Sequence, residues 1–277
     1  MKRTLAALTS ATMLAGAAVA TMSTSATAAP APTRAFGMTA DRTLVSFDVN
    51  RPGGADRIAK ITGLKGDKRL VGLDFRLKNK TLYAVGNNGG IYTINTRTAD
   101  ADRVGRLSAP LKGVSFGVDV NPAADALRIV SNAGQNLRYS FAEKTTTVDG
   151  RLNTPDVADP VRGIKAAAYT NNDNSDKTGT ALYDLNAALG NVSLQVPANA
   201  GTITPQGSTG RKLFGQVGFD IASGVTGGKA TSNAGFASFT SGGTVGLWTV
   251  NLTTGDLRKV GTFPKGAAVT DFSVAVG

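Results

Sequence analysis

Residues 72–107 read GLDFRLKNKTLYAVGNNGGIYTINTRTADADRVGRL and contain four short apolar segments separated by Gly, Asn and Asp. Short runs rich in β-branched and aromatic residues, bounded by turn residues, are typical of antiparallel strands joined by tight hairpins. The stretch therefore predicts one four-stranded antiparallel unit. Its expected strands are Gly72–Phe75, Leu82–Val85, Ile91–Ile94 and Val104–Leu107.

The unit recurs along the chain, most clearly at its third strand. The third-strand segments begin about 50 residues apart, and four-stranded repeats of about 40–50 residues are the signature of a β-propeller. These segments are Leu44–Phe47, Ile91–Ile94, Leu137–Ser140, Val192–Gln195 and Leu247–Val250. The first strand recurs as a Gly-x-Asp pattern in Gly72–Phe75, Gly117–Val120 and Gly218–Ile221.

The two ends of the repeat region predict how the ring closes. The N-terminal copy begins at its second strand, Ala35–Thr39, whereas the C-terminal region carries a spare strand, Val269–Val274. We expect this strand to pair into the first blade, because closure removes the open sheet edges that invite aggregation. The prediction is an all-β, five-bladed β-propeller over residues 35–277. A β-sandwich would explain the strands but not the displaced terminal strand.

The expected blades depart from the unit in different ways. Blade four carries a polar insertion at Asn171–Thr178, and blade five has a Gly/Thr/Ser-rich stretch, Ser223–Ser232, with weak strand signal. The five blades are expected at Ala35–Leu64 with Val269–Val276, Lys68–Leu107, Leu111–Leu152, Val161–Ser208 and Leu213–Phe263.

Residues 1–28 have the pattern of a secretory signal peptide. Lys2 and Arg3 precede the apolar run Leu5–Ala20, and Ala26–Ala28 offers a small-x-small cleavage site. Residues 29–34 are expected to form a linker. The sequence thus predicts a secreted, extracellular protein, and no other segment is apolar over the length that a membrane span needs.

Composition excludes several classes of function. The chain contains no His and no Cys, so it can form neither a disulfide nor a Ser-His-Asp or Cys-His catalytic arrangement. Its net charge is +11, with the basic residues dispersed along the sequence. A dispersed charge favours a solvated surface with weak affinity for anionic cell-wall polymers, and specific nucleic-acid binding is not expected. We expect a monomer.

Motifs in blades three, four and five resemble one family. They are Asp119–Pro122, Asp125–Ser131, Gly134–Arg138, Ala166–Asn172 and Leu247–Gly255. The sequence is similar to the secreted bacterial domain-of-unknown-function family four-three-nine-four over nearly all of the part that follows the expected signal peptide. The resemblance implies a propeller-like domain in an exported protein. It implies no established activity and no catalytic residues.

Four aspartates follow a common pattern in the first strands: Asp74, Asp119, Asp220 and Asp271, with Ala168 at the corresponding place in blade four. First strands are innermost in a propeller, so these carboxylates could converge on the central channel and hold Ca²⁺ or Mg²⁺. Alternatively, each accepts hydrogen bonds from the backbone of the turn that follows its strand. The structural interpretation is favoured, because each of these segments precedes a turn. Ala168 weakens the metal interpretation, since it leaves one position of the ring without a carboxylate.

Blade three carries a second candidate site. Asn132, Gln135, Asn136 and Arg138 surround its central hairpin, whereas the corresponding segment of blade two, Gly86–Gly90, is a plain turn. Amides and a guanidinium can bind sugar hydroxyls or an anion. Hydrogen bonding of the same amides to nearby backbone is the alternative interpretation.

The sequence favours a non-catalytic scaffold that binds an extracellular ligand, such as a glycan or an anionic cell-wall polymer. The alternative is a metal-dependent hydrolase or lactonase with its site at the mouth of the channel. A glycosidase would need a paired carboxylic acid and carboxylate. Glu143, the only Glu, lies in a polar turn.

Overall fold

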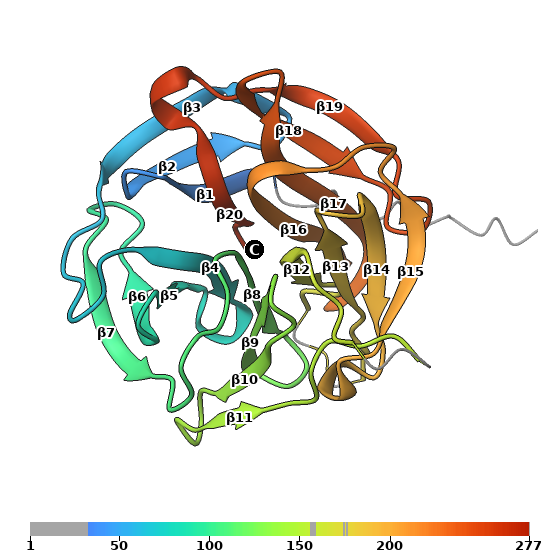
Figure 1. Cartoon of the computed structure of the whole chain (residues 1–277). Helices are drawn as coiled ribbons and strands as arrows, with labels where there is room; N and C mark the ends of the chain where they lie inside the picture. The colour runs from blue at the N-terminus through green and yellow to red at the C-terminus, as the bar shows by residue number, and fades with distance from the viewer. Residues whose placement is uncertain (1–32, 156–158, 174, 176, 277) are drawn as a thin grey trace, which may run out of the picture.

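The computed structural model describes residues 33–155, 159–173, 175 and 177–276. Five four-stranded sheets surround a central axis, with strands β4, β8, β12, β16 and β20 innermost (Figure 1). The five-bladed β-propeller predicted from sequence is confirmed. The proposed signal peptide and most of the proposed linker lie outside the described residues.

Each blade is a four-stranded antiparallel sheet. The first combines β20 (Val269–Val274) with β1 (Arg34–Thr39), β2 (Thr43–Asp48) and β3 (Arg51–Lys60). The second contains β4 (Leu70–Arg76), β5 (Thr81–Gly86), β6 (Gly90–Ile94) and β7 (Ala101–Arg106). The third contains β8 (Phe116–Asn121), β9 (Ala126–Ser131), β10 (Asn136–Ser140) and β11 (Thr146–Val148).

The remaining two blades follow the same order. The fourth contains β12 (Ile164–Tyr169), β13 (Leu182–Asn186), β14 (Asn191–Gln195) and β15 (Ile203–Ser208). The fifth contains β16 (Phe214–Thr226), β17 (Lys229–Ser241), β18 (Thr244–Val250) and β19 (Leu257–Thr262). Helical structure in the described residues is limited to the 3-10 turns Leu77–Asn79, Ala198–Ala200 and Lys265–Ala267. None of the helices described is long and apolar enough to cross a membrane.

Strand β20 closes the ring. It pairs antiparallel with β1, so that Phe36 lies opposite Ser273 and Met38 lies opposite Asp271. The two ends of the repeat region therefore share one sheet, as the sequence predicted. The inner edge of blade one is formed by residues far from β1 in the sequence.

Glycines of the Gly-x-Asp pattern allow the inner strands to approach closely. A Cβ atom on Gly72 would collide with the side chain of Val118, and one on Gly117 would collide with the backbone of Ala166 and Ala167. Each contact is made to the next blade around the axis. The glycine is therefore required for packing at the axis, where neighbouring strands converge.

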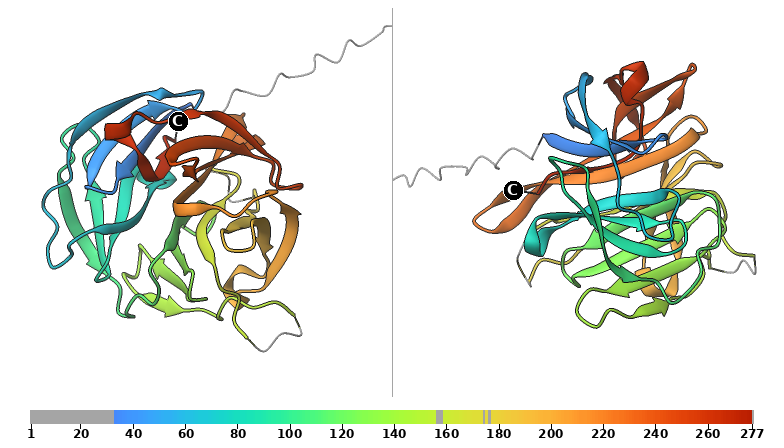
Figure 2. Two further views of the ribbon diagram at one scale, coloured as in Figure 1. Left: turned by 45° about the horizontal axis from the view of Figure 1, so that its top comes forward. Right: turned by 90° about the vertical axis from the view of Figure 1, so that its left-hand side faces the viewer.

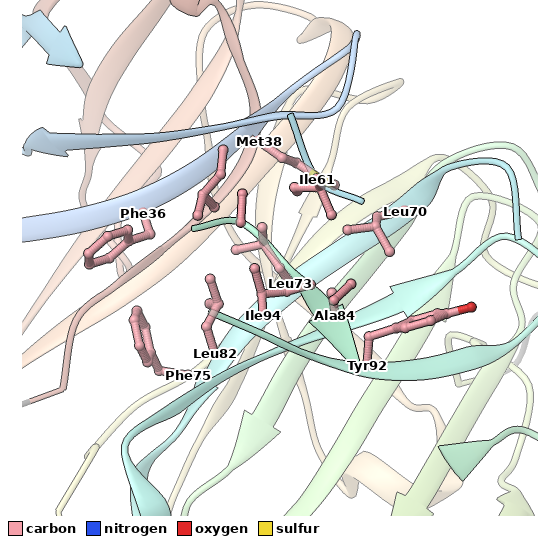
Figure 3. Close-up of a cluster of buried hydrophobic side chains, with 13 residues drawn as sticks. Phe36, Met38, Ile61, Leu70, Leu73, Phe75, Leu82, Ala84, Tyr92 and Ile94 are labelled. Atoms are coloured by element: carbon pink, nitrogen blue, oxygen red, sulfur yellow. The ribbon is translucent and has the colours of Figure 1, made fainter. Parts of the chain in front are cut away.

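Apolar side chains between neighbouring blades form the core. Between blades one and two, Phe36 and Met38 pack with Leu73, Phe75 and Leu82, all less than 10% exposed (Figure 3). Phe36 and Phe75 meet edge to face with ring centroids 5.8 Å apart. Burial of such surfaces is the main stabilising contribution in a chain without disulfides.

The Gly-rich stretch of blade five is more regular than its sequence predicts. Ser223–Ser232 forms the end of a long hairpin between β16 and β17, each 13 residues long, which extends to one side of the propeller (Figure 2). The blade-four insertion holds it there. Asp173 accepts a 2.6 Å hydrogen bond from the backbone of Ala230, and Asn171 bonds to Asn233. This support compensates for the weak local strand propensity.

Ring closure predicts a large cost for truncating the side chain of Phe272. This residue is 1% exposed on β20 and packs edge to face against Phe47. Phe272→Ala should lower the free energy of unfolding by about 3–5 kcal/mol, the usual cost of removing a buried phenyl ring. Urea denaturation measures this directly.

The matched control is Phe214→Ala, because Phe214 is 63% exposed. That substitution should change the stability by less than about 0.5 kcal/mol. Equal effects of the two substitutions would contradict closure of the ring by β20.

Candidate functional site at the central channel

Three inner strands place an aspartate on the axis of the propeller. Asp74 lies on β4, Asp119 on β8 and Asp220 on β16, and all three are buried. One carboxylate oxygen from each lies within 4.8 Å of the others. The convergence expected from the sequence is therefore present for these three residues.

Each of these carboxylates accepts a backbone hydrogen bond from the next blade. In each case the donor is the residue directly after the one that occupies the equivalent position on the neighbouring inner strand. The bonds join Asp74 to Val120 (2.7 Å), Asp119 to Tyr169 (2.8 Å) and Asp220 to Val274 (2.6 Å). Each of these side chains satisfies a buried amide of the neighbouring blade, so the three hydrogen bonds tie adjacent blades together.

This arrangement corrects the structural role predicted from the sequence. The sequence predicts donors in the turn after each strand, whereas the amides of Val120, Tyr169 and Val274 belong to the neighbouring blade. The strands are so close at the axis that the adjacent backbone is within reach of the side chain, and the turn lies at the far end of the strand. Sequence spacing within one blade carries no information about this contact.

Asp271 does not occupy the ring position that the sequence assigned to it. Ser273 does: its Oγ accepts a hydrogen bond from the amide of Phe75 (3.1 Å) and donates one to Asp74 Oδ1 (2.6 Å). Asp271 lies two residues earlier and accepts from the amide of Leu73 (2.9 Å). A shift of two residues keeps a side chain on the same face of a strand, so the alternating pattern could not distinguish the two registers.

Blade four contributes no carboxylate, as Ala168 indicated. In the other blades the aspartate accepts from the residue that follows the next ring position. For an aspartate at position 168 this donor would be the amide of Ile221. Asp220 accepts this amide with Oδ1 (2.6 Å) while Oδ2 receives Val274. One carboxylate thus bonds to two amides and completes the ring.

The electrostatics of the cluster follow from burial and like charge. Burial raises the pKa of Asp74 and Asp119 well above the ordinary value, and the charge of Asp220 raises both further. Burial likewise raises the pKa of Asp220 and of Asp271. The oxygen atoms could ligate a divalent cation, which would compensate the repulsion. Metal binding by the four aspartates stays a prediction.

A cavity of about 200 Å³ opens at the end of the channel where the inner strands begin. It is bounded by the β1–β2 hairpin and by the starts of β4, β8, β16 and β20, and Asp271 lies among its lining residues. At Val71 and Thr270 the strand pairing is interrupted by a β-bulge, and both residues line the cavity. Bulges re-aim side chains in this way at many binding sites.

Two of the predicted ligand-binding amides fasten a loop. Asn132 accepts hydrogen bonds from the amides of Val114 (2.9 Å) and Ser115 (3.1 Å). Gln135 accepts one from the amide of Lys112 (2.8 Å) and donates one to a carbonyl of the same loop. These side chains fix the segment that leads into β8, one wall of the cavity.

The other two predicted residues belong to the boundary between blades three and four. Asn136 is 1% exposed; it accepts from Arg128 (2.8 Å) and donates to backbone carbonyls of both blades. Arg138 is half-exposed and forms an ion pair with Asp149 (3.2 Å). Ligand binding by this set of four stays a prediction. The amide oxygens of Asn132, Gln135 and Asn136 and the amide nitrogens of Gln135 and Asn136 have partners within the protein.

Sequence reasoning missed the arginines at the mouth of the channel. Arg42 and Arg69 both line the cavity. Arg42 has a φ of 66° at a hairpin position where blades two and three have Gly89 (86°) and Gly134 (81°). An arginine at an aligned glycine position is a signal that comparison of the repeats could have found.

The family match covers most of the chain. Residues 43–273 match the Domain of unknown function (DUF4394), and the protein belongs to this family. A comparison with curated proteins gives no match.

Several solved structures have similar chain traces at low sequence identity. Myxococcus xanthus glutaminyl cyclase is 15% identical over 78% of this chain and 87% of its own, with a TM-score of 0.47. TolB from Acinetobacter baumannii is 11% identical over 89% and 68%, also with a TM-score of 0.47. A Lactobacillus plantarum protein is 12% identical over 88% and 99%, with a TM-score of 0.41.

The axial cluster predicts opposite effects of charge removal and hydrogen-bond removal at Asp119. The folded protein keeps protons on this group at pH values where the unfolded chain, with a pKa near 3.8, has released them. The stability of the wild type should therefore fall as the pH rises above about 4. Asp119→Asn removes the contribution of this residue to the pH dependence and keeps an acceptor for Tyr169, so it should be more stable than the wild type at pH 8.

Asp119→Ala removes the acceptor as well and leaves the buried amide of Tyr169 without its partner. It should be less stable than Asp119→Asn by about 1–3 kcal/mol. Urea denaturation at pH 4.5 and pH 8 measures both effects. Equal stability of the two variants would contradict the structural role of this carboxylate. So would a free energy of unfolding that rises with pH in the wild type relative to Asp119→Asn.

Proposed function

We propose that this protein is an extracellular binding protein that holds a small polar ligand in the channel-mouth cavity without catalysing its conversion. The cavity carries the proposal. Arg42, Arg69 and Gln216 line it, and their side chains form no hydrogen bond or ion pair with any other described residue. Polar groups that converge on a concave site without internal partners are typical of ligand recognition.

The frame around the cavity supports a preformed site. The segment before β4 is held by Asn87, which accepts from the amides of Lys68 (2.8 Å) and Arg69 (3.0 Å). The segment before β8 is held in the same way by Asn132. A rigid frame lowers the conformational cost of binding.

The enzyme alternative has weaker support. A metal-dependent hydrolase or lactonase would use the axial carboxylates as ligands, but Asp74, Asp119 and Asp220 already bond to the amides of neighbouring inner strands. The absence of His and Cys from the sequence also removes the commonest general base and the thiol nucleophile. Binding therefore accounts for the site with fewer additional assumptions.

Filling the cavity tests this proposal. Gln216 is exposed at the start of β16, and Gln216→Trp would place an indole in the space of about 200 Å³. We expect ligand affinity to fall at least tenfold in titration calorimetry with ligands found on a glycan array. Stability should change little, because Gln216 is exposed and its side chain forms no hydrogen bond with another described residue.

Gln206→Trp is the matched control. Gln206 is exposed on β15, the outermost strand of blade four. This variant should bind as the wild type does. Unchanged binding by Gln216→Trp would place the ligand elsewhere and contradict the proposal.

A further inference from the structure

Resting on that proposed function, we infer that the cavity takes a small oxyanion, a phosphate or a carboxylate, held by the guanidinium groups of Arg42 and Arg69. The two arginines lie on different blades, one on the β1–β2 hairpin and the other before β4. A guanidinium presents a planar pair of N–H donors that matches the oxygens of phosphate and carboxylate. Two such groups at one cavity favour an anion over a neutral ligand.

The backbone of Arg42 is held in a conformation that glycine prefers. Its amide donates to the carbonyl of Thr39, and its carbonyl accepts from the amide of Ile61. Gly89 makes the same pair of bonds in blade two, and Gly134 makes it in blade three. Only blade one of these three has a side chain at this left-handed position. Strained positions of this kind recur at ligand-binding sites, and this one brings a guanidinium to the channel mouth.

Arg69 is positioned by a pair of hydrogen bonds between its backbone and Asn87. Its amide donates to Asn87 Oδ1, and its carbonyl accepts from the Asn87 amide. The backbone is thus fixed on both sides while the side chain remains exposed. The equivalent position in blade three, bonded in the same way to Asn132, is occupied by Ser115.

The acidic groups near the mouth are already engaged. Asp41, adjacent to Arg42, accepts from Thr39, Thr43 and Arg57, and these bonds lower its pKa to about 2. Asp271 accepts the amide of Leu73 deeper in the channel. Asp271 lines the cavity together with the two arginines, but neither aspartate forms an ion pair with Arg42 or Arg69, so both guanidinium groups are open to an incoming anion.

The size of the cavity limits the ligand. A volume of about 200 Å³ corresponds to about six or seven water molecules at about 30 Å³ each. This space suits inorganic phosphate or a single sugar acid. A longer anionic polymer could place one charged unit in the cavity and extend outwards.

Titration calorimetry at low ionic strength with three probes tests the inference. Inorganic phosphate and glucuronate represent the two sources of an oxyanion, and glucose is the neutral control. We expect the wild type to bind at least one oxyanion and to bind glucose at least tenfold more weakly. Arg42→Gly and Arg69→Gln should each weaken oxyanion binding at least tenfold.

Arg42→Gly also separates binding from folding. Its melting temperature should equal or exceed that of the wild type, because glycine tolerates the φ of 66°. Arg97→Gln is the matched control, since Arg97 is exposed on the turn between β6 and β7, outside the cavity. This variant should bind the oxyanion as the wild type does.

Two results would overturn the inference. If glucose binds as tightly as the oxyanions, and Gln216→Trp weakens this binding while the arginine substitutions do not, the oxyanion class is wrong and the proposed binding function stands. If none of the three probes binds, or if oxyanion binding survives both arginine substitutions, the assignment of Arg42 and Arg69 is wrong.

Discussion

The hydrogen bond that a backbone amide of one inner strand donates to an aspartate of the neighbouring inner strand holds the centre of this propeller. Inner strands meet at the axis with little space between them. Each forms the inner edge of its sheet, so the amides on that edge have no further strand to pair with. Asp74, Asp119 and Asp220 satisfy such amides, and the hydroxyl of Ser273 does so in blade one. Buried amides must find acceptors, which accounts for the short polar side chain at this position in four of the five blades.

This constraint explains the Gly-x-Asp pattern and its exceptions. Glycine permits the close approach that brings the carboxylate within reach, as at Gly117. Where Ala168 replaces the acid, Asp220 takes a second amide. The cost is electrostatic, because buried carboxylates near one another resist ionisation. The axial carboxyl groups thus serve the packing of the blades, whereas the proposed ligand site lies at the mouth of the channel, where Arg42 and Arg69 line the cavity.

The fold could be predicted because its signals are local or repeated: strands with period two, turns rich in Gly and Asn, and the displaced strand Val269–Val274. The site could be predicted only in part. The sequence pattern places Asp271 at the ring position that Ser273 occupies, because residues two apart on a strand face the same side and the pattern does not distinguish them. The partners of the carboxylates, and the convergence of Arg42 with Arg69, arise between blades, and no spacing within one repeat encodes them.

Native-state hydrogen exchange tests the central claim most directly. If carboxylate–amide bonds join the blades into one cooperative unit, the amides of Val120, Tyr169 and Val274 should exchange only through global unfolding. Their exchange free energies should then be equal and should match the free energy of unfolding from urea denaturation. Exchange of any of these amides through a local opening, at a much lower free energy than the others, would contradict the account.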